Sequence, residues 1–225
     1  MEENKVRTSL KAVPYRQIYQ AMRREGGHQH WWPGETPFEV MVGAILTQNT
    51  AWANVEKAIH NLKQAKVLTP WKLGRMPLAK LRSLIRPSGF FNVKARRLRE
   101  FLKFFREKYS NSIRKMKRKK TDVLRNELLT VKGIGRETAD SILLYALGKP
   151  IFVVDAYTRR IFSRHALVQA GADYDQIRRG FESHLPRFRA LFNDYHAQIV
   201  RIGKNYCRKT PDCTHCPLQF LFEPR

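Results

Sequence analysis

Asp155 is the residue of this sequence best placed to do chemistry. It follows the apolar run Ile151-Phe152-Val153-Val154, and a helical pattern begins directly after it, so we expect it at a helix N-cap. There the helix dipole and the free N–H groups of the first turn keep a carboxylate ionised. A fixed carboxylate can stabilise developing positive charge and can orient or deprotonate an attacking water. A purely structural N-cap is the commoner use of such an aspartate, and this alternative stays open.

A glycine-rich turn precedes Asp155 in the run Val131-Lys132-Gly133-Ile134-Gly135-Arg136-Glu137-Thr138-Ala139. Apolar residues end the segment before it and return at helical spacing from Ala139 to Leu147, which predicts helix, tight hairpin, helix. Glycines let the backbone approach a ligand closely, and the second helix presents free N–H groups. This combination binds phosphate without reading base sequence. Because a Gly-x-Gly turn joins many helix pairs, the turn alone is weak evidence.

Helical patterns also run through the rest of the chain. An amphipathic helix is predicted over residues 5–25, a loop over 26–37 and a buried stripe over 38–46. Further helices are predicted over 54–62, after Thr69-Pro70, after Met76-Pro77, over 173–185 and over 188–207. No segment shows sustained strand alternation, so the fold class is expected to be all-α.

Composition limits the classes of function. With 43% hydrophobic and 28% charged residues, the chain fits a soluble globular protein. Lys and Arg exceed Asp and Glu by 43 to 19, a net charge of +24, which favours a polyanionic partner and nucleic acid first. No stretch is long and apolar enough to span a bilayer, and Met1-Glu2-Glu3-Asn4-Lys5 does not resemble a secretory signal. We expect a cytoplasmic monomer, nucleoid-associated in a prokaryote.

The hairpin and the aspartate together carry a family resemblance. Val-Lys-Gly-Ile-Gly-Arg-Glu-Thr-Ala, followed by Val-Val-Asp-Ala-Tyr-Thr-Arg-Arg, resembles the helix-hairpin-helix and Gly/Pro-Asp signature of the endonuclease III superfamily of DNA glycosylases. The resemblance implies two helical domains flanking a DNA-binding cleft. One is a helical barrel over 36–149 ending in the hairpin, and the other combines 1–35 with 150–225. It also implies that Asp155 is catalytic and that duplex DNA with a damaged base is the partner. The implied DNA contacts are Lys132, Gly133, Ile134, Gly135, Arg136 and Thr138.

Glu137 departs from the pattern of the bifunctional members. They resemble this chain around the hairpin but carry a lysine at this point, whose amine forms a Schiff base and allows strand cleavage. A glutamate cannot form an imine, and Lys132 lies on the other side of the hairpin. We therefore expect a monofunctional glycosylase with water as nucleophile and no amine in the cleft able to replace it. Glu137 is expected to face the same cleft as Asp155, where it could assist the water or accept a hydrogen bond from the base.

Four aromatic or proline positions suggest which damaged base is the substrate. Trp31-Trp32-Pro33, Trp52 and Glu137 together resemble the 3-methyladenine DNA glycosylase III branch. A flipped base needs flat apolar walls, and a cationic base such as 3-methyladenine gains roughly 1–2 kcal/mol per good cation–π contact. Such a base also leaves without a strong general acid. On residue statistics alone, Trp31 and Trp32 would instead fill the core beneath the loop.

Two further segments resemble DNA-reading parts of the family. Leu-Thr-Gln-Asn-Thr is similar to the segment whose glutamine fills the gap left by the extruded nucleotide, which assigns that role to Gln48. The alternative is a helix-terminal glutamine that binds backbone. In the Gly-aromatic turn at Gly89, Phe90 or Phe91 could wedge beside the lesion, or be core. Residues 94–120 carry thirteen Lys or Arg and two Glu, 13 − 2 = +11, and an apolar helix face there is formed by Leu98, Phe101, Leu102 and Phe105. Within this stretch, residues 112–120 form a basic run that is expected to follow phosphates, although such runs are often solvated loops.

The three cysteines lie near the end of the chain. Cys207, Cys213 and Cys216 read Cys-x5-Cys-x2-Cys and resemble the family's iron–sulfur loop, but Phe222 stands where the fourth cysteine would be. A four-iron, four-sulfur cluster needs four thiolates as a rule. The alternatives are a cluster with an open iron or with His215, a zinc site, and a loop held by ordinary packing. The expected hydrolysis itself requires no cofactor.

Other functions compete with this hypothesis. A thymine or uracil mismatch glycosylase, or an endonuclease III-like glycosylase on oxidised pyrimidines, would share the fold. A non-catalytic binder of damaged DNA would share the charge. A basic RNA-binding protein is disfavoured because no aromatic-glycine RNA motif or sheet signature is present.

Overall fold

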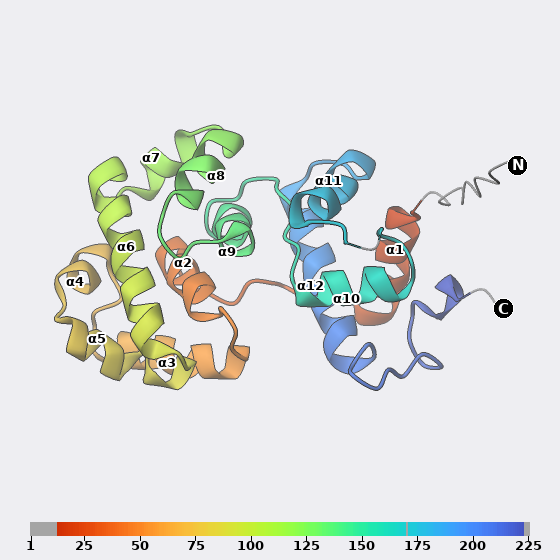
Figure 1. Cartoon of the computed structure of the whole chain (residues 1–225), viewed down its shortest axis with the longest axis horizontal. Helices are drawn as coiled ribbons and strands as arrows, with labels where there is room; N and C mark the ends of the chain where they lie inside the picture. Colours follow the sequence, from red (N-terminus) through yellow and green to blue (C-terminus); the bar gives the residue numbers. More distant parts are fainter. Residues whose placement is uncertain (1–12, 170, 223–225) are drawn as a thin grey trace, which may run out of the picture.

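The computed structural model describes residues 13–169 and 171–222, and in that part every regular element is a helix (Figure 1). The all-α prediction is therefore confirmed. The helices are α1 (Tyr15–Gly26), α2 (Pro37–Leu46), α3 (Trp52–Gln64), α4 (Pro70–Arg75), α5 (Leu78–Leu84), α6 (Phe91–Tyr109), α7 (Ile113–Arg118), α8 (Thr121–Leu129), α9 (Arg136–Ser141), α10 (Ala156–Arg164), α11 (Tyr174–His184) and α12 (Arg189–Asn205). The helix predicted over 5–25 begins at Tyr15, and residues 5–12 lie outside the described part.

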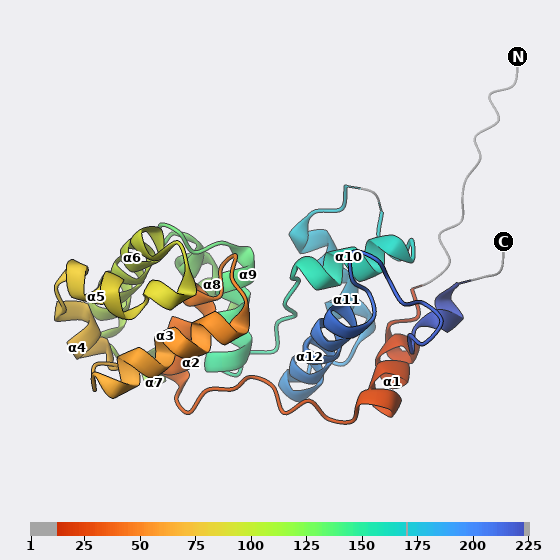
Figure 2. The same cartoon turned by 90° about the horizontal axis from the view of Figure 1, so that it is seen from below.

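The helices form two groups in space. Figures 1 and 2 show α2 to α9 on one side and α1 with α10, α11 and α12 on the other. Two extended stretches, near residues 27–36 and 148–155, run between the groups. The second group thus draws on segments from both halves of the sequence. Domain boundaries at 35/36 and 149/150 remain our proposal.

Helix α2 lies at the centre of the first group. Nine of its ten residues are buried, from Phe38 to Leu46, because it contacts α3, α6 and α9 on different sides. Its start is specified locally: the Thr36 hydroxyl accepts from Glu39 N at 3.1 Å, and Pro37 occupies the first turn. Helix α6 packs on α2 through the predicted apolar face of Leu98, Phe101 and Phe105. This packing fixes the loop after α2, which carries Gln48.

The hairpin between α8 and α9 has the predicted form. Gly133 has φ +91°, and a Cβ there would lie 2.4 Å from Arg97 Cγ, so a glycine is required. Helix α9 continues as a single π-helical segment, Ile142–Ala146, which packs on α2 and α12. Such segments are frequent near functional sites.

An aromatic cluster in the second group fixes the segment before Asp155. The Phe152 and Phe181 rings stack at 3.8 Å and 9°, and Phe152 also meets the edge of Tyr195. Ile151 to Val154 are each at most 1% exposed, and Val154 N donates to Tyr174 Oη at 3.3 Å. This burial and the hydrogen bond to Tyr174 therefore fix the backbone that leads into α10.

Three cations at the start of the basic stretch 94–120 are bonded inside the protein. Lys94 is buried, and its Nζ donates to Leu46 O at 2.7 Å and Ser88 O at 2.6 Å. Arg97 and Arg99 also hydrogen-bond inside the protein, to Gln48 and to backbone carbonyls of Gly74 and Met76. These donors satisfy helix ends and loops, and the phosphate-following role of residues 112–120 stays a prediction. None of the described helices is long and apolar enough to cross a membrane.

Candidate active site

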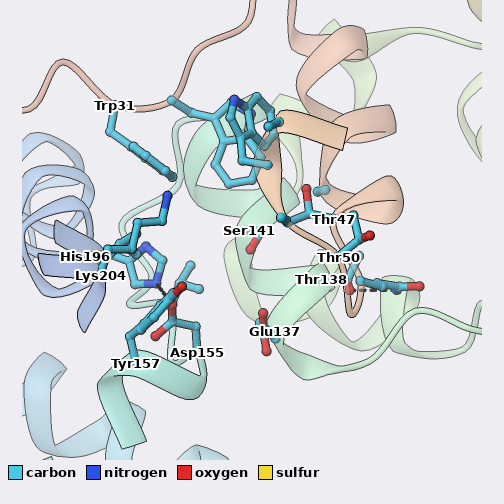
Figure 3. A pocket seen from close by; sticks show the side chains of 18 of the residues that line it. Trp31, Thr47, Thr50, Glu137, Thr138, Ser141, Asp155, Tyr157, His196 and Lys204 are labelled. Carbon is cyan, nitrogen blue, oxygen red and sulfur yellow. Dashed lines mark hydrogen bonds and ion pairs between the residues drawn. The ribbon is translucent and has the colours of Figure 1, made fainter. Parts of the chain in front are cut away.

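A cavity of about 450 Å³ opens between the two groups of helices (Figure 3). Figure 3 shows Asp155, His196 and Tyr157 on one side of it and Glu137, Thr138 and Ser141 on the other. Trp31, Trp32 and Trp52 add the apolar part of the wall. The cavity thus brings together the predicted catalytic carboxylates and the predicted indoles, from segments far apart in the sequence.

Asp155 is the N-cap of α10, as predicted. Its Oδ1 accepts from Thr158 N at 2.7 Å and from Thr158 Oγ1 at 2.8 Å. In return, Asp155 N donates to Thr158 Oγ1 at 3.4 Å, which together with the Thr158 N bond forms a capping box. Its Oδ2 lies 3.5 Å from His196 Nε2. Burial alone would raise the pKa of Asp155, but the charge and hydrogen bond of His196 and the two Thr158 hydrogen bonds hold it below its ordinary value. Asp155 can therefore be the structural N-cap of α10 and an ionised carboxylate in the cavity at the same time.

Glu137 stands in the first turn of α9 and faces the cavity from the other group. The Glu137 side chain is exposed to the cleft. Its pKa is nevertheless raised, first because surrounding protein atoms desolvate the carboxyl group, and then because of the nearby charge of Asp155. His196 and Arg159 act in the opposite direction without reversing the shift. One cavity therefore contains a carboxyl group with a lowered pKa and one with a raised pKa, which is a common acid–base arrangement in active sites.

The indoles form an aromatic wall. Trp32 meets Trp52 edge-on at 4.9 Å and 83°, and Trp31 meets Trp32 at 5.5 Å and 79°. The Trp31 and Trp32 Nε1 atoms are buried without a hydrogen-bond partner, whereas Trp52 Nε1 donates to Glu56 Oε1 at 2.7 Å. Trp31 and Trp32 are half-buried and line the cavity, and Trp32 also packs against the hydrophobic core. Pro33 is exposed and lines an adjoining hollow with Trp32 and Trp52, so its place in the base pocket stays a prediction.

Gln48 lies at the cavity and is tied to the hairpin. Its Nε2 donates to Gly133 O at 3.0 Å and to Thr138 Oγ1 at 2.9 Å, and its amide oxygen accepts from Arg97. In this structure the glutamine therefore binds backbone, the alternative given above. Filling a gap in DNA would require it to exchange these partners.

The predicted hairpin contacts differ in exposure. Lys132, Gly135 and Arg136 are exposed, whereas the Ile134 and Thr138 side chains are 5% and 7% exposed. Ile134 and Thr138 can therefore offer DNA only their backbone groups. Arg136 Nε lies 3.1 Å from Asp175 Oδ2, so its guanidinium is shared with α11 in the absence of DNA.

Sequence reasoning missed two residues of α12. His196 and Lys204 both line the cavity, together with Val200. Their spacing of four residues puts all three on one helix face, a signal that the sequence contains. In Figure 3 the Lys204 side chain runs beside His196 toward Trp31. The cleft therefore contains an amine, that of Lys204, because α12 contributes a wall that only the tertiary arrangement reveals. That no amine in the cleft is able to replace water stays a prediction.

The cysteine loop does not present a set of metal ligands. Among the described residues, no group of three or more His, Cys, Asp or Glu side chains is placed to hold a metal ion. Arg164 Nη1 donates to Cys207 Sγ at 3.2 Å, and His215 Nδ1 lies 3.0 Å from Asp212 Oδ1. With Phe222 at the fourth position and His215 facing Asp212, the residues present do not fit a four-thiolate cluster.

Comparison with known proteins decides the family. The description "HhH-GPD superfamily base excision DNA repair protein" matches residues 42–187, a range that contains the hairpin, Glu137 and Asp155. The chain belongs to the HhH-GPD superfamily of base excision DNA repair proteins. Among its relatives in this superfamily is a provisionally named DNA repair glycosylase of Methanocaldococcus jannaschii, 49% identical over 220 residues and 97% of both chains. Endonuclease III of Thermotoga maritima is 30% identical over 81% of both chains.

Solved structures of this superfamily share the fold. The Helicobacter pylori 3-methyladenine DNA glycosylase MagIII bound to 1,N6-ethenoadenine superposes with a TM-score of 0.75 at 31% identity, over 84% of this chain and 97% of that chain. A non-covalent endonuclease III–DNA complex superposes with a TM-score of 0.80 at 24% identity, over 94% and 95% of the two chains. The protein is thus a base excision DNA repair glycosylase by family, and its lesion remains to be assigned.

Proposed function

We propose that the protein is a monofunctional DNA glycosylase that hydrolyses the N-glycosidic bond of an extruded alkylated purine such as 3-methyladenine. The observation that carries the proposal is the cavity itself, where Glu137, Asp155 and three indoles meet. A volume of about 450 Å³ suits a bicyclic base with part of its sugar. The likeness to MagIII supports the same substrate class.

The roles of the two carboxylates follow from their surroundings. Loss of the base leaves positive charge on the sugar, and the ionised, hydrogen-bonded Asp155 stabilises that charge. Glu137 has the raised pKa of a proton acceptor, so it takes the proton from the attacking water. Water supplies the oxygen of the new C1′–O bond, and the base leaves with the electrons of the C–N bond. A base that already carries positive charge leaves as a neutral molecule.

The indole walls select the base. The faces of Trp32 and Trp52 attract a cationic purine more strongly than a neutral one, by roughly 1–2 kcal/mol per good contact. Lys204 works against this preference because its ammonium lines the same cavity. Selectivity therefore combines stacking with the weaker glycosidic bond of an alkylated base.

The test is release of free base from methylated duplex DNA without alkali. The account predicts release of 3-methyladenine with an intact strand, and an abasic site that alkali then cleaves. Duplexes with G·T, G·U or an oxidised pyrimidine serve as parallel substrates, and preferential release from one of them would replace the proposed lesion.

A second candidate, a bifunctional glycosylase, is favoured by Lys204, whose ε-amine lines the cavity. Such an enzyme would nick DNA without alkali and would be trapped on DNA by borohydride. Loss of trapping in Lys204→Met would assign the Schiff base to this lysine.

We also propose a monomer that binds duplex DNA through its net charge of +24, with a cysteine loop held by packing. Absorption near 400 nm in protein purified without oxygen would contradict a cysteine loop held by packing alone. Elution as a dimer would contradict the proposed monomer.

A further inference from the structure

Behind Asp155 lies a buried chain of polar groups that the proposed chemistry does not use. His196 is 4% exposed and lies between Asp155 and Tyr145. Its Nε2 is 3.5 Å from Asp155 Oδ2, and its Nδ1 is 2.5 Å from Tyr145 Oη. Nε2 is buried and has no hydrogen-bond partner in this structure, so the 3.5 Å contact with the Asp155 carboxylate is an ion-pair contact. An imidazole placed in this way has few acceptable protonation arrangements.

The tyrosine selects among those arrangements. The pKa of Tyr145 is well above its ordinary value because of burial and the charges of Asp155 and Glu137, so its hydroxyl keeps its proton. When His196 is neutral, that hydroxyl can donate to Nδ1, which leaves the ring hydrogen on Nε2, pointing at Asp155. When His196 carries the charge that lowers the pKa of Asp155, Nε2 has its hydrogen as well. The other tautomer would set the Nε2 lone pair against a carboxylate oxygen, and this repulsion disfavours it.

The two oxygens of Asp155 are therefore held differently. Thr158 donates twice to Oδ1 from within the same helix, which anchors that oxygen to α10. Among the residues that the structure describes, Oδ2 has its polar contact with His196, from α12. The imidazole thus sets the rotation of the carboxylate plane about its anchored oxygen, and with it the direction in which Oδ2 meets the cavity.

Tyr145 also connects this chain to the base pocket. Its ring lies 4.8 Å from the Trp32 ring, at an interplanar angle of 34°. Tyr145 belongs to the π-helical segment that follows α9, which packs on both α2 and α12. Tyr145, which contacts the imidazole of His196, thus also packs against Trp32 in the aromatic wall of the cavity.

We propose that His196 and Tyr145 are positioning residues for the glycosidic cleavage. The His196 Nε2–H group orients Asp155 through Oδ2, and the Tyr145 hydroxyl holds the imidazole in the tautomer that this requires. This inference rests on the proposed function. Neither residue touches the base or the sugar in this account, and both act through Asp155.

The test uses three variants measured in single-turnover base release and in DNA binding. His196→Leu removes the donor at similar volume, and we expect the rate to fall about tenfold to a hundredfold, the effect of one hydrogen bond to a charged group. His196→Gln keeps an N–H donor near the Nε2 position and should restore most of the rate. Tyr145→Phe should lose roughly fivefold to tenfold, the effect of a neutral hydrogen bond. Affinity for damaged duplex should stay within about twofold in all three variants, because an interaction that acts only in the transition state does not change ground-state binding.

A second readout does not depend on activity. In carboxyl-carbon NMR titrations of the free protein, His196→Leu should raise the pKa of Asp155, because His196 is the main group that lowers it against burial. His196→Gln should raise it less. Apart from His196 and Tyr145, the titratable groups that face Asp155 across the cavity or beside it are Glu137, Tyr157 and Lys204, and these three are kept unchanged in the variants.

A matched control is Tyr206→Phe. It also removes a tyrosine hydroxyl, one that donates to Glu25 at 2.9 Å outside the cavity, and should leave the rate unchanged. Unchanged rates and an unchanged Asp155 pKa in folded His196→Leu and Tyr145→Phe would overturn the inference. If His196→Leu does not fold, Tyr145→Phe and His196→Gln decide the question. If the wild type releases no base from any substrate, the proposed function fails and the inference fails with it, whereas an active wild type with indifferent variants overturns only the inference.

Discussion

Glu137 and Asp155 reach one cavity from two different groups of helices, and the protein shifts the pKa values of their carboxyl groups in opposite directions. Asp155 is fixed by Thr158 and His196, whereas Glu137 accepts no hydrogen bond from another described side chain within the cavity. A fixed anion suits charge stabilisation, and a less constrained group of higher pKa suits proton transfer. The predictions below follow from this division of roles.

Asp155→Asn should abolish most base release while leaving the fold intact. We expect a loss of at least about a hundredfold, because the amide cannot stabilise the charged sugar. Asparagine is also a good N-cap, so the thermal midpoint should change little. The matched control is Asp173→Asn, which alters the same kind of capping box at α11, away from the cavity. Equal binding of damaged duplex by Asp155→Asn and wild type, with no base released by either, would indicate a binder that does not cut.

The rate should depend on pH through Glu137. Because the deprotonated form accepts the proton and its pKa is raised above the ordinary 4.5, activity should fall as the pH drops through that raised value. Asp155, with its lowered pKa, stays ionised over the same range. Glu137→Gln should be slower and should lose this acid limb, as measured by single-turnover rates between pH 4 and 8. A limb that persists in Glu137→Gln would assign it to another group.

Replacing Glu137 by lysine should change the reaction. Glu137→Lys places an amine beside the sugar, so we expect borohydride trapping and strand nicking that the wild type lacks. Glu137→Met, of similar length without an amine, is the control. Trapping of the wild type to the same extent would show that Lys204 already supplies the amine.

The indole walls should control the preference for a cationic base. Trp32→Leu or Trp52→Leu should reduce release of 3-methyladenine relative to a neutral purine such as hypoxanthine, by about fivefold to thirtyfold for a contact of 1–2 kcal/mol. Trp71→Leu is the control, because this tryptophan is 55% exposed on α4 and stacks on Arg75 outside the cavity. A uniform loss on both substrates would argue for a packing role of the indoles.

Phe90 should act on the DNA duplex. It is 69% exposed in a left-handed conformation beside Gly89, whose added Cβ would lie 3.6 Å from Thr50 Oγ1 at the cavity rim. Phe90→Ala should weaken binding to a damaged duplex without lowering stability, measured by fluorescence anisotropy and thermal unfolding. Phe188→Ala, 66% exposed on the other group of helices, is the comparison. Phe91, half-buried and near Arg86, is the less suitable wedge.

The sequence predicted what depends on local rules and missed what depends on tertiary placement. The hairpin, the Asp155 cap and the face of α6 follow from glycine, capping and helical periodicity, and the structure has them. The buried role of Lys94 could not be predicted, because a lysine in a basic stretch gives no sign that its amine will satisfy buried carbonyls. His196 and Lys204 were missed because their helix face is recognisable only once another group of helices lies opposite. For Pro33, a motif match does not tell which side of a loop faces a cavity, and in the structure it lines the adjoining hollow.

The most direct measurement compares wild type and Asp155→Asn on methylated duplex DNA, with the released bases separated by chromatography and the strand analysed with and without alkali. The account predicts free 3-methyladenine from the wild type, no strand break before alkali, and at least about a hundredfold less base from Asp155→Asn. Base release that survives the substitution, or a strand break without alkali, would contradict it.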